Sequence, residues 1–239
     1  MRLDKLLSNM GIGSRKDVKT LLKKKQVLVN GKVVKDNGMK VDPIRDEISL
    51  DGEAIHYRQY IYLMMNKAPG YISATSDTRE KTVIDLLGED VRHFQPFPVG
   101  RLDKDTEGLL LLTNDGDLAH QLVSPKKNVG KTYYAKISGF VTEDDIAAFG
   151  EGVMLEDGYV SKPAELVIIN SDAVSEIKVT ITEGKFHQVK RMFEAVDKKV
   201  IYLKRLSMGD LVLDENLRLG TYRELSESEL AYCMSLKNK

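Results

Sequence analysis

The chain has 239 residues, of which 42% are hydrophobic, and its acidic and basic residues balance to a formal net charge of zero. This length allows one large domain, or a small domain beside a larger one. The first ten residues mix Arg2, Asp4 and Lys5 among leucines, which argues against a signal peptide, and no apolar run is long enough to span a bilayer. We therefore expect a cytoplasmic protein.

The cysteine and histidine content argues against a disulfide framework and against a metal site. Cys233 is the single cysteine, so it can form neither an intramolecular disulfide nor a thiolate-rich zinc site. The histidines are scattered without the spacing of metal ligands, at His56, His93, His120 and His187. We expect no bound metal.

Positive charge is concentrated near the N-terminus. Residues 1–42 contain eleven Lys and Arg residues against four Asp and Glu residues, so the rest of the chain carries the opposite excess. A basic segment of this kind is typical of proteins that contact nucleic-acid phosphates. We expect this segment to bind phosphate and the remainder to have a more selective function.

The basic segment predicts two helices followed by a hairpin. Apolar residues three and four positions apart over 3–10 predict a helix that ends at Gly11. Ser14, with Asp17 three residues later, predicts the N-cap of a second helix. Two short strands are expected on either side of Asn30-Gly31, because this dipeptide accepts the positive φ angles of a type I′ turn.

This order of elements, in the sequence RLDKLLSNMGIGSRKDVKTLLKKKQVLVNGKVV, resembles the S4 RNA-binding domain. The alternative for Lys23-Lys24-Lys25 is a solvated helix end, because exposed lysines often have no specific role. The polar, turn-rich residues 40–58 end in the expected linker, so the S4-like αβ module with its linker covers residues 1–58. The resemblance implies RNA contacts by the basic side chains Arg2, Arg15, Lys16, Lys19, Lys23 and Lys24.

Residues 59–239 predict an α+β domain with a mixed, largely antiparallel sheet flanked by helices. The strand predictions rest on apolar runs and on alternation, and cover 60–65, 109–113, 133–137, 166–169 and 177–181. The predicted helices lie between them, at 83–87, at 117–123, after the cap at Thr142, and at 186–196. In the last helix we expect Phe186, Val189, Phe193 and Val196 to form the buried face.

The most densely charged segment is residues 100–108, GRLDKDTEG, which runs directly into four leucines. Charged loops before buried strands often border active sites. A calcium loop is excluded, because the twelfth position counted from Asp103 is Asn114 rather than a bidentate Glu. The remaining alternative is a solvated turn whose acidic residues pair with Arg101 and Lys104.

Four motifs in the order expected for one family favour the active-site interpretation. They are Asn66-Lys67-x-x-Gly70, Gly100-Arg101-Leu102-Asp103, Lys131-Thr132-Tyr133 and Glu183-Gly184-Lys185-Phe186-His187-Gln188-Val189-Lys190-Arg191-Met192. Together they resemble the motifs of pseudouridine synthases. The S4-like module, the His-Gln-Val-Lys-Arg-Met variant and Lys162-Pro163-Ala164 resemble the branch that modifies one uridine of small-subunit (16S) rRNA.

The resemblance implies a role for each matched residue. Asp103 would be the catalytic aspartate, Lys190 the cation that keeps it ionised in a closed pocket, and Tyr133 the residue that packs on the target base. Many family members have Arg where Lys190 stands, and Lys lacks the planar fork of Arg. In the last motif Leu203 would pack near the base and Arg205 would belong to the framework. Further RNA contacts are expected from Arg101, His187 and Arg191.

The expected reaction is the isomerisation of a uridine that has been flipped out of the RNA. It involves no redox change and no second substrate, so we expect no cofactor. The expected partner is small-subunit rRNA or an assembling small subunit, and we expect a monomer. Two alternatives remain: a large-subunit (23S) rRNA pseudouridine synthase, and a catalytically inactive rRNA-binding assembly factor.

Overall fold

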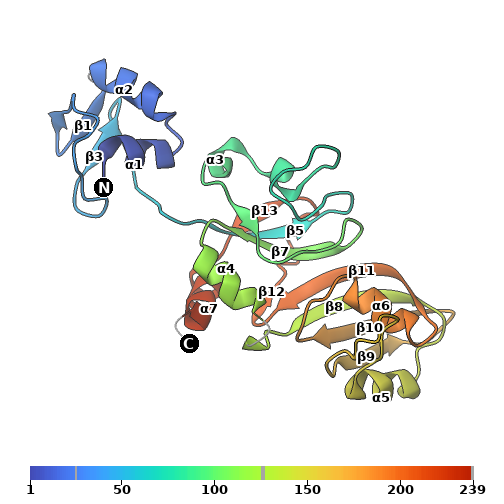
Figure 1. Ribbon diagram of the computed structural model, residues 1–239. Coiled ribbons are helices and arrows are strands. Elements are labelled where there is room, and N and C mark those ends of the chain that lie inside the picture. Colours follow the sequence, from blue (N-terminus) through green and yellow to red (C-terminus); the bar gives the residue numbers. More distant parts are fainter. Residues whose placement is uncertain (25, 125–126, 238–239) are drawn as a thin grey trace. The chain divides into compact units, whose positions relative to one another are not determined.

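The computed structural model describes residues 1–24, 26–124 and 127–237 (Figure 1). The chain divides into two compact units, which we call unit 1 (Met1–Ile61 and Gly88–Pro96) and unit 2 (Tyr62–Leu87 and Phe97–Lys239). Lys25, which belongs to the basic N-terminal segment, lies outside the described residues. In the described part of the chain, no helix is both long enough and apolar enough to cross a membrane.

Unit 1 combines short helices with a small antiparallel sheet. Its strands lie in the order β2-β1-β3-β4. The elements are α1 (Leu3–Asn9), α2 (Arg15–Lys23), β1 (Val27–Val29), β2 (Lys32–Val33), β3 (Ile48–Leu50), β4 (Glu53–Ala54) and α3 (Glu89–Arg92). α1, α2 and the sheet share one core, made by Leu3, Leu6, Leu7, Val18, Leu22, Val27, Val29, Val34, Val41 and Ile48.

Local sequence explains most of unit 1. Ser14 and Asp17 form the expected capping box at the start of α2. Asn30 and Gly31 both have positive φ angles, of 51° and 73°, as a type I′ turn requires. Residues 40–58, expected to be turn-rich, also contain β3 and β4. β3 forms there because Ile48 pairs with Val29 of β1 and is buried in the core.

Unit 2 is built on a mixed sheet with the strand order β13-β5-β7-β11-β8-β10-β9. β11 and β7 pair in parallel, whereas the other described pairs are antiparallel, as predicted. The strands are β5 (Tyr62–Lys67), β6 (Phe97–Pro98), β7 (Glu107–Thr113), β8 (Lys131–Ser138), β9 (Glu165–Asn170), β10 (Val174–Ile181), β11 (Lys199–Met208), β12 (Leu211–Val212) and β13 (Tyr222–Glu224).

Helices lie against both ends of this sheet (Figure 1). α6 contacts β11, α5 contacts β9, and α4 packs against α7. The helical elements are η1 (Val83–Leu86), α4 (Gly116–Val123), α5 (Glu143–Glu151), α6 (Gln188–Glu194) and α7 (Glu227–Lys237). The predicted helix at 83–87 is only this short 3-10 turn, whereas the Thr142 cap of α5 is present as a capping box.

The strand β11 and the helix α7 of unit 2 were not predicted, and neither were the short strands β6, β12 and β13. β11 is the longest described strand, and with β7 it forms the parallel pair of the main sheet among the described strands. α7 contributes Cys233 to a core that it shares with Met64 and Leu111 of the sheet. Both elements therefore owe their place to contacts with residues far away in the sequence.

Candidate active site

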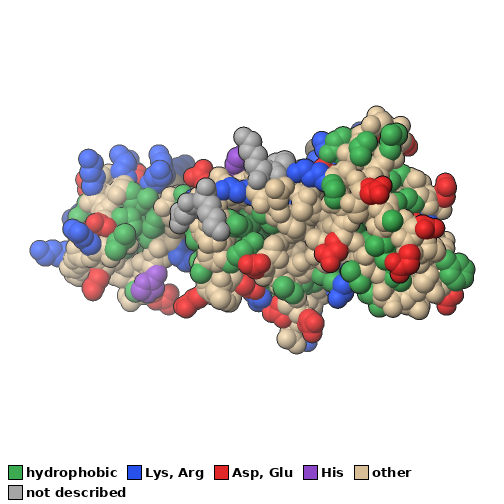
Figure 2. Space-filling model, turned by 90° about the horizontal axis from the view of Figure 1, so that it is seen from below, with side chains coloured by type: hydrophobic (Ala, Val, Ile, Leu, Met, Phe, Trp, Pro, Cys, Tyr) green, Lys and Arg blue, Asp and Glu red, His purple; other side chains and the backbone are tan. Residues whose placement is uncertain are grey.

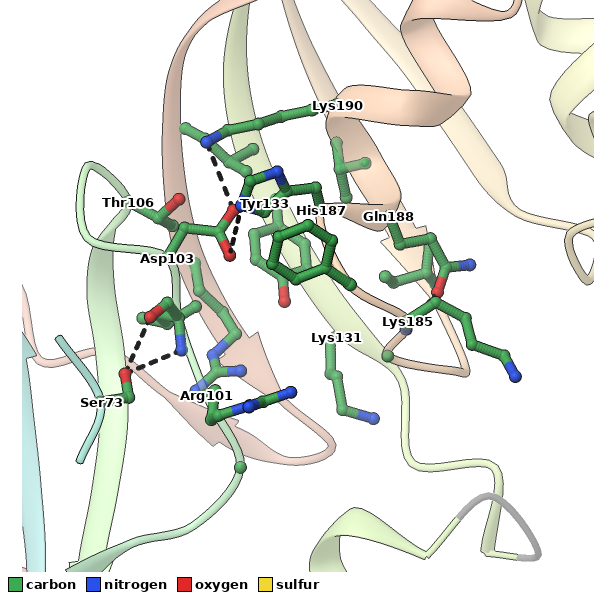
Figure 3. A pocket seen from close by; sticks show the side chains of 18 of the residues that line it. Ser73, Arg101, Asp103, Thr106, Lys131, Tyr133, Lys185, His187, Gln188 and Lys190 are labelled. Carbon is green, nitrogen blue, oxygen red and sulfur yellow. Dashed lines mark hydrogen bonds and ion pairs between the residues drawn. The ribbon is translucent and has the colours of Figure 1, made fainter. Parts of the chain in front are cut away.

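A pocket of about 530 Å³ lies within unit 2 and is lined by residues of several distant segments. Pockets that hold a small molecule or a single base are typically ~300–1,000 Å³. Asp103, Tyr133 and Lys190, the three residues expected to be catalytic, line it together (Figure 3). Arg101 and His187, expected to contact RNA, line it as well.

Asp103 lies on a turn that is fixed by its neighbours. The Ser73 hydroxyl accepts a hydrogen bond from the backbone N–H of Leu102 (2.9 Å) and donates one to the carbonyl of the same residue (2.8 Å). Leu102 itself is 5% exposed. The residue before Asp103 is thus held by its backbone and by its side chain. No sequence motif indicated Ser73, whose role follows from its position in the fold.

Lys67 fixes the other side of this turn. Its ammonium group is fully buried and donates hydrogen bonds to the carbonyl oxygens of four residues, Ala68, Asp103, Lys104 and Thr106, at 2.9–3.4 Å. Burial lowers the pKa of Lys67 to about 8, and the negative charges of Asp105, Asp103 and Glu107 oppose this shift. The lysine of the first motif therefore organises the turn that presents Asp103.

The Asp103 carboxylate points into the pocket between the side chains of His187 and Lys190, at the start of α6. Lys190 Nζ lies 3.3 Å from Asp103 Oδ2, and His187 Nε2 lies 3.7 Å from Asp103 Oδ1 (Figure 3). The Asp103 side chain is 27% exposed. The Lys190 ammonium group therefore lies within ion-pair distance of this carboxylate.

Lys190 is shared between two carboxylates. Its Nζ also contacts both oxygens of Asp105, at 2.7 and 2.9 Å, which is closer than its contact with Asp103. Burial alone would lower the pKa of Lys190, but the hydrogen bond with Asp105 and the charge of Asp103 raise it above its usual value. Burial opposes ionisation of Asp105, yet the bond with Lys190 lowers the pKa of that carboxyl group. Lys190 and Asp105 are therefore favoured in their charged forms.

The helix that carries Lys190 begins later than predicted. α6 starts at Gln188, because the preceding His187 adopts a left-handed conformation with φ 49° that interrupts a helix. Phe186, expected on the buried face, is 68% exposed instead, and its ring stacks on that of His187 at 3.8 Å between centroids. The buried face of α6 is made by Val189, Met192 and Phe193.

A buried carboxylate holds the loop before α6. Glu183 accepts hydrogen bonds from the Tyr159 hydroxyl (2.6 Å), from the backbone N–H of Lys162 (3.0 Å) and from the Gln188 side-chain amide. Gln188 in turn accepts a bond from the backbone N–H of Lys185 at 2.8 Å. The motif residues Glu183 and Gln188 thus have a structural function. Both residues were recognised as members of the motif, but their partners could not be predicted from it.

The charged side chains of the turn at 100–108 do not form ion pairs with one another in the described structure. Lys104 pairs with Glu80 at 2.6 Å, and Glu107 accepts a hydrogen bond from the Tyr202 hydroxyl at 2.8 Å. Arg101 is exposed at the pocket and makes no ion pair with any residue that the structure describes. The alternative of a solvated turn with internal ion pairs is therefore wrong.

Tyr133 and Tyr134 lie on opposite faces of β8. Tyr133 is 7% exposed and lines the pocket, whereas the ring of Tyr134 lies against that of Tyr202, with the ring centroids 6.0 Å apart. This is the alternation that a strand imposes. Only the first of these two tyrosines can contact a molecule in the pocket.

The remaining residues expected to bind RNA lie in different surroundings. The side chains of Arg15, Lys16, Lys19, Lys23 and Lys24 are exposed on or next to α2, and basic side chains are visible over unit 1 in Figure 2. Arg2 instead makes two hydrogen bonds to the buried Asp4, at 2.7 and 3.0 Å. Arg191 pairs with Asp157 at 2.6 Å and is not one of the residues that line the pocket.

The donor set of the pocket suits charge stabilisation rather than metal binding. Within the described ranges, no group of three or more His, Cys, Asp or Glu side chains is arranged to hold a metal ion. The pocket combines a carboxylate next to a lysine, a buried aromatic ring and several cations. Such a site can bind a planar, polar ring and stabilise charge that moves between that ring and the carboxylate.

Comparisons with known proteins agree with this arrangement. Residues 61–195 match the family model of RNA pseudouridylate synthases, and residues 1–48 match that of the S4 domain. A crystal structure of a pseudouridylate synthase superposes with a TM-score of 0.68 at 35% identity, and the match covers 98% of this chain and 99% of the other.

Three curated relatives match over nearly the full length. An uncharacterized RNA pseudouridine synthase of Bacillus subtilis is 54% identical, with 96% of this chain and 97% of the relative covered. A ribosomal small subunit pseudouridine synthase A of Yersinia pestis is 40% identical, with 97% of each chain covered. A ribosomal large subunit pseudouridine synthase B of Bacillus subtilis is 38% identical, with 96% and 93% covered.

Proposed function

The chain belongs to the family of RNA pseudouridylate synthases, and from that premise we propose that it converts one uridine of small-subunit rRNA to pseudouridine, with Asp103 as the catalytic carboxylate. The observation that carries this proposal is the Asp103–Lys190 pair, 3.3 Å apart, in a pocket that also contains the buried face of Tyr133. A carboxylate must be ionised to attack carbon, and the ammonium group of Lys190 lies beside the Asp103 carboxylate.

The residues of the pocket have distinct roles in the proposed reaction. The reaction breaks the bond between C1′ of the ribose and N1 of uracil, turns the base and joins C1′ to C5. Asp103 engages the flipped nucleotide as a carboxylate does in retaining glycoside hydrolysis. Tyr133 stacks on the base and relays the proton that leaves C5. The reaction is redox-neutral, so the proposal includes no cofactor.

RNA recognition in this proposal involves both units. The uridine must leave the RNA stack before it can reach Asp103, at a cost of a few kcal/mol. Arg101 and His187 at the pocket contact the RNA around the flipped nucleotide, and the exposed cations of α2 bind phosphates elsewhere on the rRNA. We place the enzyme in the cytoplasm, where it acts as a monomer on rRNA or on an assembling small subunit.

The choice of ribosomal subunit rests on motif variants and on one relative. The relative from Yersinia pestis, at 40% identity, is named for the small subunit, and the His-Gln-Val-Lys-Arg-Met motif points to the same branch. The second candidate is a large-subunit target, favoured by the relative from Bacillus subtilis that is 38% identical. An inactive assembly factor is disfavoured, because Asp103, Lys190 and Tyr133 are all retained and lie in one pocket.

The test is to map pseudouridines in rRNA from cells that lack the gene and are complemented with wild type or with Asp103→Asn. We expect the wild type to restore one pseudouridine in the small-subunit rRNA and Asp103→Asn to restore none, because an amide cannot serve as the nucleophile. Restoration by Asp103→Asn would refute the catalytic assignment. A missing pseudouridine in the large-subunit rRNA would refute the choice of target.

A further inference from the structure

Lys131 and Arg205 form a second cationic cluster in the pocket, apart from the Asp103–Lys190 pair. Lys131 lies two residues before Tyr133 on β8, and Arg205 on β11 pairs with Tyr133 in the antiparallel register. The three side chains therefore share one face of the sheet. Lys131 is 9% exposed and Arg205 is 2% exposed, and both line the pocket.

Neither cation of this cluster is neutralised by a carboxylate. Arg205 Nε donates to the carbonyl of Leu109 at 2.7 Å, and Lys131 Nζ donates to the carbonyl of Val129 at 3.0 Å. Within the described ranges, neither side chain makes an ion pair, and the buried Nη2 of Arg205 has no hydrogen-bond partner. Burial lowers the pKa of Lys131, and the positive charge of Arg205 lowers it further.

The acidic residues that line the pocket are engaged elsewhere. Asp103 pairs with Lys190, and Glu183 accepts bonds from Tyr159, Gln188 and the backbone of Lys162. Two like charges held near each other in a buried wall are costly, and buried polar groups normally have partners. An oxygen with negative charge would satisfy both groups, and it must come from a bound molecule.

We propose that Lys131 and Arg205 form an oxyanion site for the uracil base, which binds a carbonyl oxygen of the flipped base while negative charge accumulates on the ring. This inference rests on the proposed function. Both groups lie beside the tyrosine on which the base would stack. The cations that suit a backbone phosphate, Arg101 and Lys185, are instead exposed at the pocket. In the view of Figure 3, Lys131 and Lys190 lie on opposite sides of Tyr133.

The charge on the base follows from the electron balance of the reaction. If an Asp103 oxygen bonds to C1′, the C1′–N1 bond breaks and its electron pair stays on the base, spread over N1 and the carbonyl oxygens. If that oxygen adds to C6 instead, the C5–C6 π pair moves onto O4. In both cases C5 then bonds to C1′, and the Asp103 oxygen leaves C1′ or C6 as a carboxylate. C5 loses its proton and N1 gains one, so the base ends neutral. Donors already aimed at such an oxygen stabilise the transition state.

The test compares Lys131→Gln, Lys131→Arg, Arg205→Gln and Arg205→Lys with the wild type and Asp103→Asn. The substrate is small-subunit rRNA from cells that lack the gene, labelled with tritium at C5 of uridine. Tritium release under single-turnover conditions gives the rate, and RNA binding at several salt concentrations gives Kd. The exposed Lys178→Gln on β10 is the matched control, expected to behave as wild type.

We expect each Gln variant to lower the rate at saturating enzyme by about a hundredfold, the typical effect of removing one oxyanion donor, with Kd changed less than about twofold. The charge-conserving variants should recover part of the rate. Arg205 also anchors Leu109, so Arg205→Gln can fail to fold. In that case Lys131→Gln, checked by its unfolding midpoint, decides the result.

Two outcomes would overturn the proposal. An unchanged rate at saturation with a raised Kd, and with a salt slope reduced by about one per lost charge, would assign the pair to a backbone phosphate. An unchanged rate together with an unchanged Kd would mean that Lys131 and Arg205 have only a structural role. The failure of the proposed function is a separate result: the wild type itself would then release no tritium from this RNA.

Discussion

Lys67 shows how a single buried residue can support a site that it does not line. Its ammonium group donates to four carbonyl oxygens around the Asp103 turn. Lys67→Met would leave these oxygens without that donor, which costs about 1–3 kcal/mol of folding free energy. We expect a lower unfolding midpoint and at least about a tenfold lower single-turnover rate, because small displacements of a catalytic group are costly.

Chemical denaturation and tritium release would measure these two effects of Lys67→Met. Lys81→Met, at an exposed position of the same unit, is the control and should change neither quantity appreciably. A Lys67→Met protein with a wild-type rate at saturating RNA would show that the turn keeps its geometry without the ammonium group.

At the scale of secondary-structure elements, Gly108 allows β7 and β11 to pair in parallel. A Cβ atom at this position would lie 2.2 Å from the carbonyl oxygen of Arg205, and the φ angle of Gly108 is +102°. Gly108→Ala must therefore separate the two strands, and we expect a loss of roughly 3 kcal/mol or more.

Urea denaturation would measure the effect of Gly108→Ala. The matched control is Gly150→Ala in α5, where a Cβ atom would meet no atom within 4 Å. Alanine favours helices, so this variant should be neutral or more stable by up to about 1 kcal/mol. Equal stabilities of the two variants would contradict the close approach of the strands.

The start of α7 is held by an ion pair that should respond to acid. Arg223 binds both oxygens of Glu229 at 2.8 Å, and this contact lowers the pKa of Glu229 to about 2. A carboxyl group with a lowered pKa stabilises the fold above its unfolded pKa of about 4.3, and this contribution is lost as the pH falls toward 2.

We therefore expect Glu229→Gln to be less stable than the wild type at pH 7, by roughly 1–3 kcal/mol, because one partner of a charge-assisted bond is lost. The difference should shrink between about pH 4 and pH 2, where the wild-type carboxylate is protonated. Urea denaturation at several pH values measures it, with the exposed Glu227→Gln as control. A difference that does not depend on pH would argue against the ion pair as its cause.

For the whole molecule, the relevant feature is the uneven distribution of charge in a chain that is neutral overall. The exposed Lys16, Lys19 and Lys23 of α2 carry part of the positive charge of unit 1. A variant with Gln at all three of these positions should bind rRNA more weakly. Its slope of log K against log salt should be smaller by about two to three, because fewer counterions are released.

RNA binding between low and physiological salt would measure this slope, and the rate at saturating RNA should remain close to that of the wild type. Lys178→Gln on unit 2 serves as the control for a single lost surface charge. A triple variant with unchanged salt dependence would remove α2 from the RNA-binding surface.

The sequence by itself determined those features whose cause is local. The capping box at Ser14 and the turn at Asn30-Gly31 depend on neighbouring residues and could be predicted from them. The motifs around Asp103, Tyr133 and Lys190 named three side chains, which the structure places in one pocket. The distribution of charge along the chain can also be determined without knowledge of the fold.

Only the tertiary structure decided which distant groups meet. β11 contains the strand-favouring run Val200-Ile201-Tyr202-Leu203, but its central position and its parallel pairing with β7 beside Gly108 depend on the fold. The exposure of Phe186 follows from the left-handed backbone of His187. Lys67 bonds to the distant turn of Asp103, and Lys131 shares the pocket wall with Arg205 of another strand. Burial, desolvation and ion pairing depend on what surrounds a group in space, so spacing along the sequence could identify the motif residues but not the environment in which each would act.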